Sequence, residues 1–201
     1  MDAFTLEGKH VRLEPLSPTH VEGLAAASAA DPSLYKWSTV PQGADAVARY
    51  VDTALAGTTL AFATVRVSDD AVIGSTRFFD FESWRWPAGH ARHSLSTPDV
   101  CEIGYTWLTK SAIRTAANTE AKLLMLTHAF EGLNLLRVCL HTDARNEQSR
   151  AAMERIGAKF EGILRSHRMA SDFIPRDSAR YSIVAAEWPA VKRGLEERLG
   201  K

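Results

Sequence analysis

The stretch Glu102-Ile-Gly-Tyr-Thr-Trp-Leu108, followed shortly by Ile113-Arg-Thr-Ala-Ala-Asn-Thr-Glu-Ala121, decides the fold of this chain. The pattern predicts a strand over Cys101–Leu108 and, over Thr119–Phe130, a helix that is apolar nearly all round and therefore buried on most faces. A loop of small residues that opens a helix leaves several backbone N–H groups unpaired. With the helix dipole behind them and Arg114 beside them, these groups suit an anion such as a pyrophosphate. An ordinary strand-to-helix turn accounts for the same residues equally well.

Downstream of this stretch, strands and helices alternate. Asn146 is expected to cap a helix that runs through Ile156, and Gly157 is expected to close it in a left-handed conformation. Such alternation predicts an α/β sheet with at least one parallel crossover. The other elements expected in this half are strands Leu136–Thr142, Phe160–Arg168 and Ala179–Val184, and an amphipathic helix Trp188–Leu199.

The first half of the chain predicts a strand, two helices and a hairpin before a long loop. Residues 82–98 show no periodicity, and a loop of that length inside a domain is usually functional. We find no repeat and no boundary, so residues 1–201 are expected to form a single domain. The expected elements are strand His10–Leu13, a helix from Ser17-Pro18-Thr19 to near Asp31-Pro32, helix Asp45–Leu55, and hairpin strands Leu60–Val67 and Val72–Phe79.

Composition excludes several classes of protein. Of 201 residues, 45% are hydrophobic and 24% are charged, and Lys plus Arg (24) equals Asp plus Glu (24). This balance argues against partners such as nucleic acid or a membrane surface. Cys101 and Cys139 each lie in an apolar run, which indicates buried thiols in a reducing compartment. The N-terminus lacks a signal-peptide pattern, and no apolar stretch approaches the about 20 residues of a membrane span. We expect a cytoplasmic monomer or homodimer.

Five stretches together resemble one family. They are residues 102–108, 114–121 and 146–165, then Asp-Ser-Ala-Arg-Tyr-Ser-Ile (177–183) and Glu-Trp (187–188). In this order they are similar to the GNAT superfamily of N-acetyltransferases, in the branch that contains the ribosomal-protein N-terminal acetyltransferases. The resemblance covers most of Leu6–Trp188 and is most specific over Asn146–Arg165.

The resemblance implies an α/β (α+β) fold with a mixed, mostly antiparallel sheet of six to seven strands and helices on both faces. The sheet would splay open between strands Cys101–Leu108 and Leu136–Thr142, where the pantetheine arm of acetyl-CoA enters. Asn146 would hydrogen-bond the pantetheine and Ser149 would lie near the sulfur. The full set of cofactor-binding residues that it implies is Trp107, Leu108, Ile113, Arg114, Thr115, Ala116, Ala117, Asn118, Thr119, Asn146, Ser149 and Arg150.

Two positions depart from the family pattern. Ile113 stands where Gln or Arg is usual, and Ala116 stands where Gly is usual. The added methyl of Ala116 either crowds the phosphates or is tolerated, the second if that position has a negative φ. Many relatives also carry a tyrosine on the Asn146–Ile156 helix to protonate the leaving thiolate. None occurs here, which leaves Ser149 or water for that step.

The expected reaction is transfer of an acetyl group from acetyl-CoA to an amine, by direct attack on the thioester. Backbone N–H groups of the splayed strand would polarise the carbonyl, and Glu102 is our candidate base, acting through water. A structural glutamate on an exposed face explains Glu102 equally well. The cysteines have no evident base for a covalent route, and the spacing of His90, His93 and His141 fits no metal template. No metal is expected.

The acceptor amine is not identified by the sequence. A protein N-terminus and a small-molecule amine both remain open. Trp37, Phe79 and Trp84 suggest an apolar wall for the acceptor, although aromatic residues in a core or a dimer contact explain them too. A different class of function also stays open, namely a non-catalytic CoA-binding sensor on the same fold.

Overall fold

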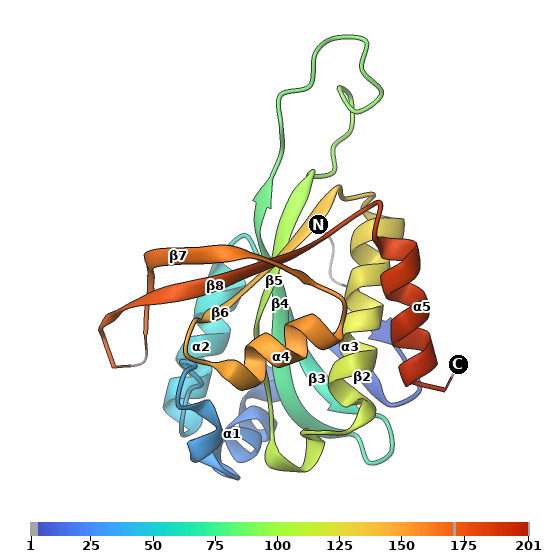
Figure 1. The fold of residues 1–201 in the computed structure, drawn as a ribbon. Helices are drawn as coiled ribbons and strands as arrows, with labels where there is room; N and C mark the ends of the chain where they lie inside the picture. Colours follow the sequence, from blue (N-terminus) through green and yellow to red (C-terminus); the bar gives the residue numbers. More distant parts are fainter. Residues whose placement is uncertain (1–3, 171, 201) are drawn as a thin grey trace.

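A single sheet organises the computed structural model, which describes residues 4–170 and 172–200. Its strand order is β1-β2-β3-β4-β5-β6-β8-β7 (Figure 1). Only β5 and β6 are parallel, and every other neighbouring pair is antiparallel. The bounds are β1 Leu6–Glu7, β2 Val11–Pro15, β3 Leu60–Arg66, β4 Ala71–Glu82, β5 Val100–Leu108, β6 Arg137–Asp143, β7 Lys159–Met169 and β8 Pro175–Val184.

The mixed, mostly antiparallel sheet and its parallel crossover are confirmed, but the expected six to seven strands become eight in the described residues. The strand that the pattern missed is β1. It has only two residues, too few for an alternating pattern to be visible.

Helices cover both faces of the sheet, as expected. Successive side chains of a strand point to opposite faces of the sheet, so two neighbouring residues of β3 show what covers each face. Phe62 belongs to the apolar cluster of α3 and α5, whereas Ala63 belongs to the cluster of α1 and α2. The helices are α1 Val21–Ala29, α2 Ala44–Ala56, α3 Ala116–Thr127, α4 Glu147–Arg155 and α5 Trp188–Arg198.

The long loop between β4 and β5 projects away from the body of the molecule (Figure 1). Asp99 anchors its base, since its carboxylate accepts from Trp84 N at 2.7 Å and Trp86 Nε1 at 3.0 Å, and pairs with Arg92 Nε at 2.8 Å. Cys101 and Cys139 are buried free thiols. Among the described residues, no helix is both long and apolar enough to cross a bilayer.

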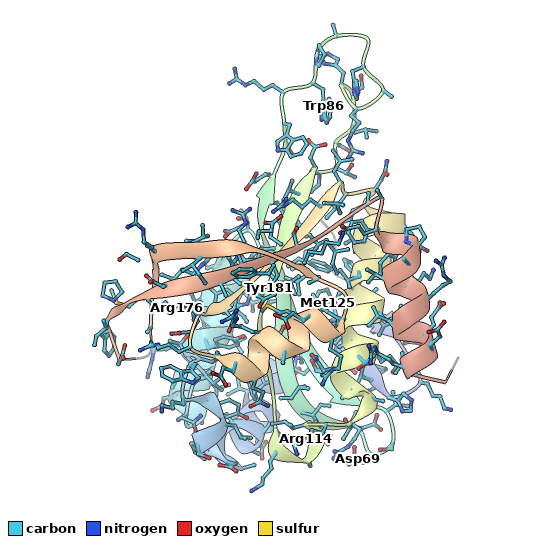
Figure 2. The ribbon with its side chains drawn as sticks, viewed as in Figure 1. Asp69, Trp86, Arg114, Met125, Arg176 and Tyr181 are labelled. Atoms are coloured by element: carbon cyan, nitrogen blue, oxygen red, sulfur yellow. The ribbon has the colours of Figure 1, made fainter. Side chains whose placement is uncertain are left out.

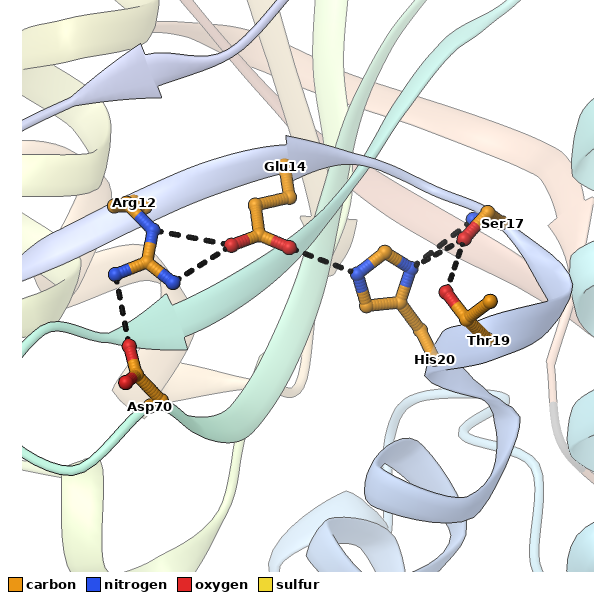
Figure 3. Close-up of polar contacts among 6 residues, drawn as sticks. All are labelled: Arg12, Glu14, Ser17, Thr19, His20 and Asp70. Carbon is orange, nitrogen blue, oxygen red and sulfur yellow. Dashed lines mark hydrogen bonds and ion pairs between the residues drawn. The ribbon is translucent and has the colours of Figure 1, made fainter.

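A chain of polar contacts links β2 to the entry of α1 (Figure 3). Glu14 accepts from Arg12 at 2.8 Å through one oxygen and lies 3.2 Å from His20 Nε2 through the other. His20 Nδ1 in turn accepts from Ser17 N at 3.1 Å, which completes a capping box. The hydrogen bond from Arg12, and then that from His20, lowers the pKa of Glu14 below its ordinary 4.5.

This lowered pKa predicts an acid-dependent contribution of Glu14 to stability. A carboxyl group whose pKa is lowered by folding contributes stability above its unfolded pKa and loses it as the pH falls through the folded pKa. We therefore expect Glu14→Gln to lower Tm at neutral pH, with the difference from wild type closing below pH 4.5. Thermal melts between pH 3 and pH 7 test this, with the exposed Glu22→Gln as control. A difference that stays constant over that range would refute it.

Candidate active site

β5 and β6 are paired over a short length and then separate. The paired positions are Val100↔Arg137, Cys101↔Val138 and Glu102↔Cys139. β5 continues to Leu108 and β6 to Asp143 without further pairing between them. The edge of β5 that faces β6 therefore has backbone groups without a strand partner beyond Glu102, inside the sheet rather than at its border. This is the splay that the sequence predicted.

A bulge in β5 lies within this splayed part. The β4–β5 ladder skips Tyr105 and Thr106, so these two residues together oppose Thr76. Tyr105 has a φ of 50°, in the left-handed region that residues other than glycine rarely occupy. Such a bulge redirects backbone N–H groups away from the ladder. Redirected N–H groups can polarise a carbonyl that enters the splay.

The segment after β5 forms an anion-binding helix start, but its boundary differs from the expected one. α3 begins at Ala116, three residues before the predicted Thr119. The reason is Thr115, whose hydroxyl accepts from Ala117 N at 3.2 Å and donates to Ala112 O at 2.7 Å. Alanines after such a cap favour helix. Residues 116–119 therefore form the first turn of α3 rather than the preceding loop.

Backbone geometry around this turn answers one question left by the sequence. Ala116 is not among the residues with positive φ, so its methyl adds no backbone strain. Arg114 is among them, with a φ of 61°, and its side chain is exposed (Figure 2). Ile113 has an extended backbone. The free N–H groups of the α3 start and the Arg114 side chain thus lie at the same end of β5.

Asn146 caps α4, as the sequence predicted. Its Oδ1 accepts from Ser149 N at 3.0 Å, and Gly157 after the helix has a φ of 92°. The Ser149 hydroxyl has no hydrogen-bond partner among the described residues. Arg150 is held back against β8, where Nε donates to Tyr181 Oη at 3.2 Å.

One of the predicted cofactor contacts, that of Trp107, can come only from the backbone. The Trp107 side chain is buried, with its ring 5.8 Å from that of Tyr35, in the cluster under α1 and α2. The carbonyl of Leu108 accepts from Tyr35 Oη at 3.1 Å. The cofactor contacts assigned to the loop and α4 residues stay predictions.

Glu102 lies at the last paired position of β5, and its side chain is buried. Oε2 is 3.0 Å from Arg168 Nη2, which also contacts Asp80 at 2.9 Å. The same oxygen lies 2.9 Å from His141 Nδ1, although the ring is not oriented for a hydrogen bond. The reading of Glu102 as an exposed structural glutamate is therefore wrong, because it lies in a buried polar cluster at the splay.

The sequence did not place His141, His167 and Arg168 beside Glu102. The rings of His141 and His167 lie 4.9 Å apart, and burial, then the neighbouring His141, lowers the pKa of His167. Arg168 comes from β7, 66 residues after Glu102. The sequence held one indication for His141. Side chains alternate between the two faces along β6, so His141 lies on the same face as Cys139, the residue that pairs with Glu102.

The three predicted acceptor residues have different neighbours, and their role in binding the acceptor stays a prediction. Phe79 lies beside this cluster, opposite Glu102 in the ladder, with its ring 5.0 Å from Tyr105. Trp37 instead lies under the guanidinium of Arg145, 4.2 Å away. Trp84 is in the projecting loop, 47% exposed and packed on Trp86, which lies far from Arg114 (Figure 2). Sequence reasoning grouped them by type alone. Within the described residues, no cluster of three or more His, Cys, Asp or Glu side chains could hold a metal.

A family model described as "Acetyltransferase (GNAT) domain" matches residues 10–159. The chain belongs to the GNAT family of acetyltransferases. The eight-stranded sheet is accordingly the GNAT fold.

Known relatives agree with this family. A Bacillus subtilis (strain 168) protein named "Putative ribosomal N-acetyltransferase YdaF" is 37% identical over 91 residues. That match covers 45% of this chain and 49% of the relative, so the chain spans about half the length of the curated protein that it matches. It supports the branch that the sequence suggested.

Two solved structures are similar over nearly the whole chain. A GCN5-related N-acetyltransferase from Brucella melitensis has a TM-score of 0.83 at 28% identity, covering 98% of this chain and 86% of that one. Mycobacterium smegmatis RimJ, in complex with CoA-disulfide, has a TM-score of 0.73 at 21% identity, covering 94% and 89%. At that identity, the second likeness shows the fold alone.

Removing the Asn146 side chain tests its role as the cap of α4 separately from its proposed role in binding acetyl-CoA. Asn146→Ala deletes the cap of α4 and should lower stability by about 1 kcal/mol. If Asn146 also hydrogen-bonds the pantetheine, acetyl-CoA should bind more weakly while the affinity for the amine changes little. Calorimetric titration and denaturant melts measure these effects, with Asn146→Asp as the variant that keeps a cap. Reduced stability with unchanged acetyl-CoA affinity would leave Asn146 as a cap alone.

Proposed function

We propose that this protein transfers an acetyl group from acetyl-CoA to a primary amine by direct attack on the thioester. The observation that supports it most is the early end of the β5–β6 ladder beside a bulge in β5, in a chain of the GNAT family. Thioester aminolysis needs a bound thioester, polarised at its carbonyl, and a deprotonated amine held in line. The whole of residues 1–201 is proposed to act as one unit.

Acetyl-CoA would enter with its pantetheine between β5 and β6. The first turn of α3, with Arg114 and Thr115, would bind the pyrophosphate through N–H groups and the helix dipole. Asn146 and Ser149 would lie at the mouth of the splay on α4. The CoA-disulfide bound by the RimJ structure is consistent with such a ligand on this fold.

Glu102 is proposed as the group that accepts the amine proton. Its burial beside His141 and Phe79 places it on the opposite side of β5 from the apolar cluster of α3. Arg168 holds one of its oxygens, which fixes the carboxylate in place. The ring of His141 lies 2.9 Å from the same oxygen, so a turn of this ring would give the proton a nearby relay. Ser149 or water would protonate the departing thiolate.

The acceptor is proposed to be a protein N-terminus or a small-molecule amine. The name of the Bacillus relative makes the N-termini of ribosomal proteins the first acceptors to test. A screen of peptides and small amines with acetyl-CoA, following free thiol release, tests the proposal directly. No thiol release with any amine, together with a rise in Tm on adding CoA, would instead favour the non-catalytic sensor.

Cofactor binding gives the simplest prediction. A ligand that binds only the folded state stabilises it by mass action, so acetyl-CoA at 100 times its Kd should add about 2.7 kcal/mol. We expect a rise in Tm that grows with ligand concentration in differential scanning fluorimetry. Adenosine alone serves as the control. No shift at millimolar acetyl-CoA would refute both the enzyme and the sensor.

The proton-accepting role predicts the behaviour of Glu102→Gln. This variant keeps the size of the side chain but removes its basic group, so kcat should fall by roughly 10²-fold with acetyl-CoA affinity nearly unchanged. The loss should shrink at alkaline pH, where more of the amine is already neutral. His141→Gln in parallel shows whether the ring relays the proton. A Glu102→Gln enzyme with the wild-type kcat at every pH would leave water as the acceptor.

A further inference from the structure

Two buried cations flank the β5 bulge, one on each face of the sheet. Arg77, 4% exposed, lies with its guanidinium 4.0 Å from the ring centre of Tyr105 and 4.7 Å from that of Tyr50 in α2. Lys122 of α3, 5% exposed, places Nζ 2.7 Å from the hydroxyl of Thr106. Tyr105 and Thr106 are the two bulge residues. Each bulge residue is thus in contact with one cation.

Neither cation has an acidic partner in the part of the chain that the structure describes. No ion pair joins a carboxylate to Arg77 or to Lys122, and Nε and Nη2 of Arg77 are buried without a hydrogen bond. Lys122 contacts hydroxyl groups only, those of Thr106 and, at 3.4 Å, Thr76. A buried charge without a counter-ion is costly. Folded proteins usually keep such costs at sites where function requires them.

The reaction proposed above creates a negative charge at this place. The amine nitrogen bonds to the thioester carbon, and the π electron pair moves onto the carbonyl oxygen. That pair then returns as the carbon–sulfur bond breaks and the thiolate leaves. The oxygen is negative only in the intermediate and the transition states that flank it. Positive groups that are already fixed around this oxygen lower the activation barrier of acyl transfer, because they need not move as the negative charge develops.

We propose that Arg77 and Lys122 are positioning residues that stabilise this oxyanion from opposite faces of the sheet, acting through Tyr105 and Thr106 without touching the substrate. The proposal rests on the proposed function. Stacking of Arg77 holds the Tyr105 ring, and the Lys122–Thr106 bond holds the next residue, so the bulge is fixed while its surroundings stay positive. Because no carboxylate among the described residues neutralises Arg77 or Lys122, the electric field of these two cations can act on the oxyanion.

Lys122 gives this field a pH dependence. Burial lowers the pKa of Lys122 to about 7. The polar groups that face it are the hydroxyls of Thr76 on β4 and Thr106 on β5. Glu120 lies two residues before Lys122 on α3 and accepts hydrogen bonds from the backbone N–H groups of Lys9 and Val11. Lys122 is therefore charged below its pKa and neutral above it. Its share of the oxyanion stabilisation should be lost as the pH rises through this range.

The test compares Lys122→Gln with wild type. Glutamine keeps an N–H donor for Thr106 but carries no charge. We expect kcat to fall about tenfold at pH 6, less than the 10²- to 10³-fold typical of a donor in direct contact, with the KM for acetyl-CoA nearly unchanged. The ratio of wild-type to variant kcat should decline toward one by pH 9. Taking this ratio cancels the titration of the acceptor amine, which is common to both enzymes.

Further variants separate charge from support of the fold. Lys122→Met removes a lone buried charge and should keep or raise Tm while kcat falls, and Arg77→Met should likewise lower kcat. Lys192→Gln, on the surface of α5, is the matched control. A Lys122→Gln enzyme with wild-type kcat at pH 6, or a ratio flat from pH 6 to pH 9, would overturn the inference. A wild-type protein that releases no CoA with any amine would instead overturn the proposed function, and this inference with it.

Discussion

The pairing of β5 with β6 ends after Glu102↔Cys139, and the rest of the site depends on that ending. Strands that stay paired satisfy one another's N–H and C=O groups, whereas strands that separate inside a sheet leave a row of them free. Here the free edge lies between two helix starts, those of α3 and α4, which follow the two diverging strands. A ligand with an extended amide-bearing arm and an anionic end matches both features. The bulge at Tyr105 adds reoriented N–H groups midway along this edge.

The buried charges of the site differ in whether they have a counter-ion. Glu102 is buried but paired with Arg168, so its negative charge has a counter-ion and a fixed position. Arg77 and Lys122 are buried without one in the described residues, next to the bulge. Elsewhere the two apolar clusters under the helices contain mainly aliphatic and aromatic side chains. These two cations therefore lie where a negative charge would develop during acyl transfer.

Much of the fold could be predicted from the sequence because its signals are local. Asn146 and Gly157 mark the ends of α4 by capping rules that involve only neighbouring residues, and both are confirmed. β1 escaped prediction because two residues carry no period. The start of α3 was placed too late because the cap is Thr115, which looks like any loop threonine until its hydroxyl is seen to accept from Ala117 N. The site was harder, since Arg168 reaches Glu102 from another strand and only the register of the sheet brings them together.

The central claim is that the gap between β5 and β6 receives the pantetheine and presents the thioester to the bulge. A crystal structure of the protein with acetyl-CoA tests it most directly. The account predicts the pyrophosphate at the first turn of α3, the pantetheine between β5 and β6 beyond Glu102, and the thioester oxygen facing the backbone of Tyr105 and Thr106. Acetyl-CoA seated on another surface, with the β5–β6 gap empty, would contradict it.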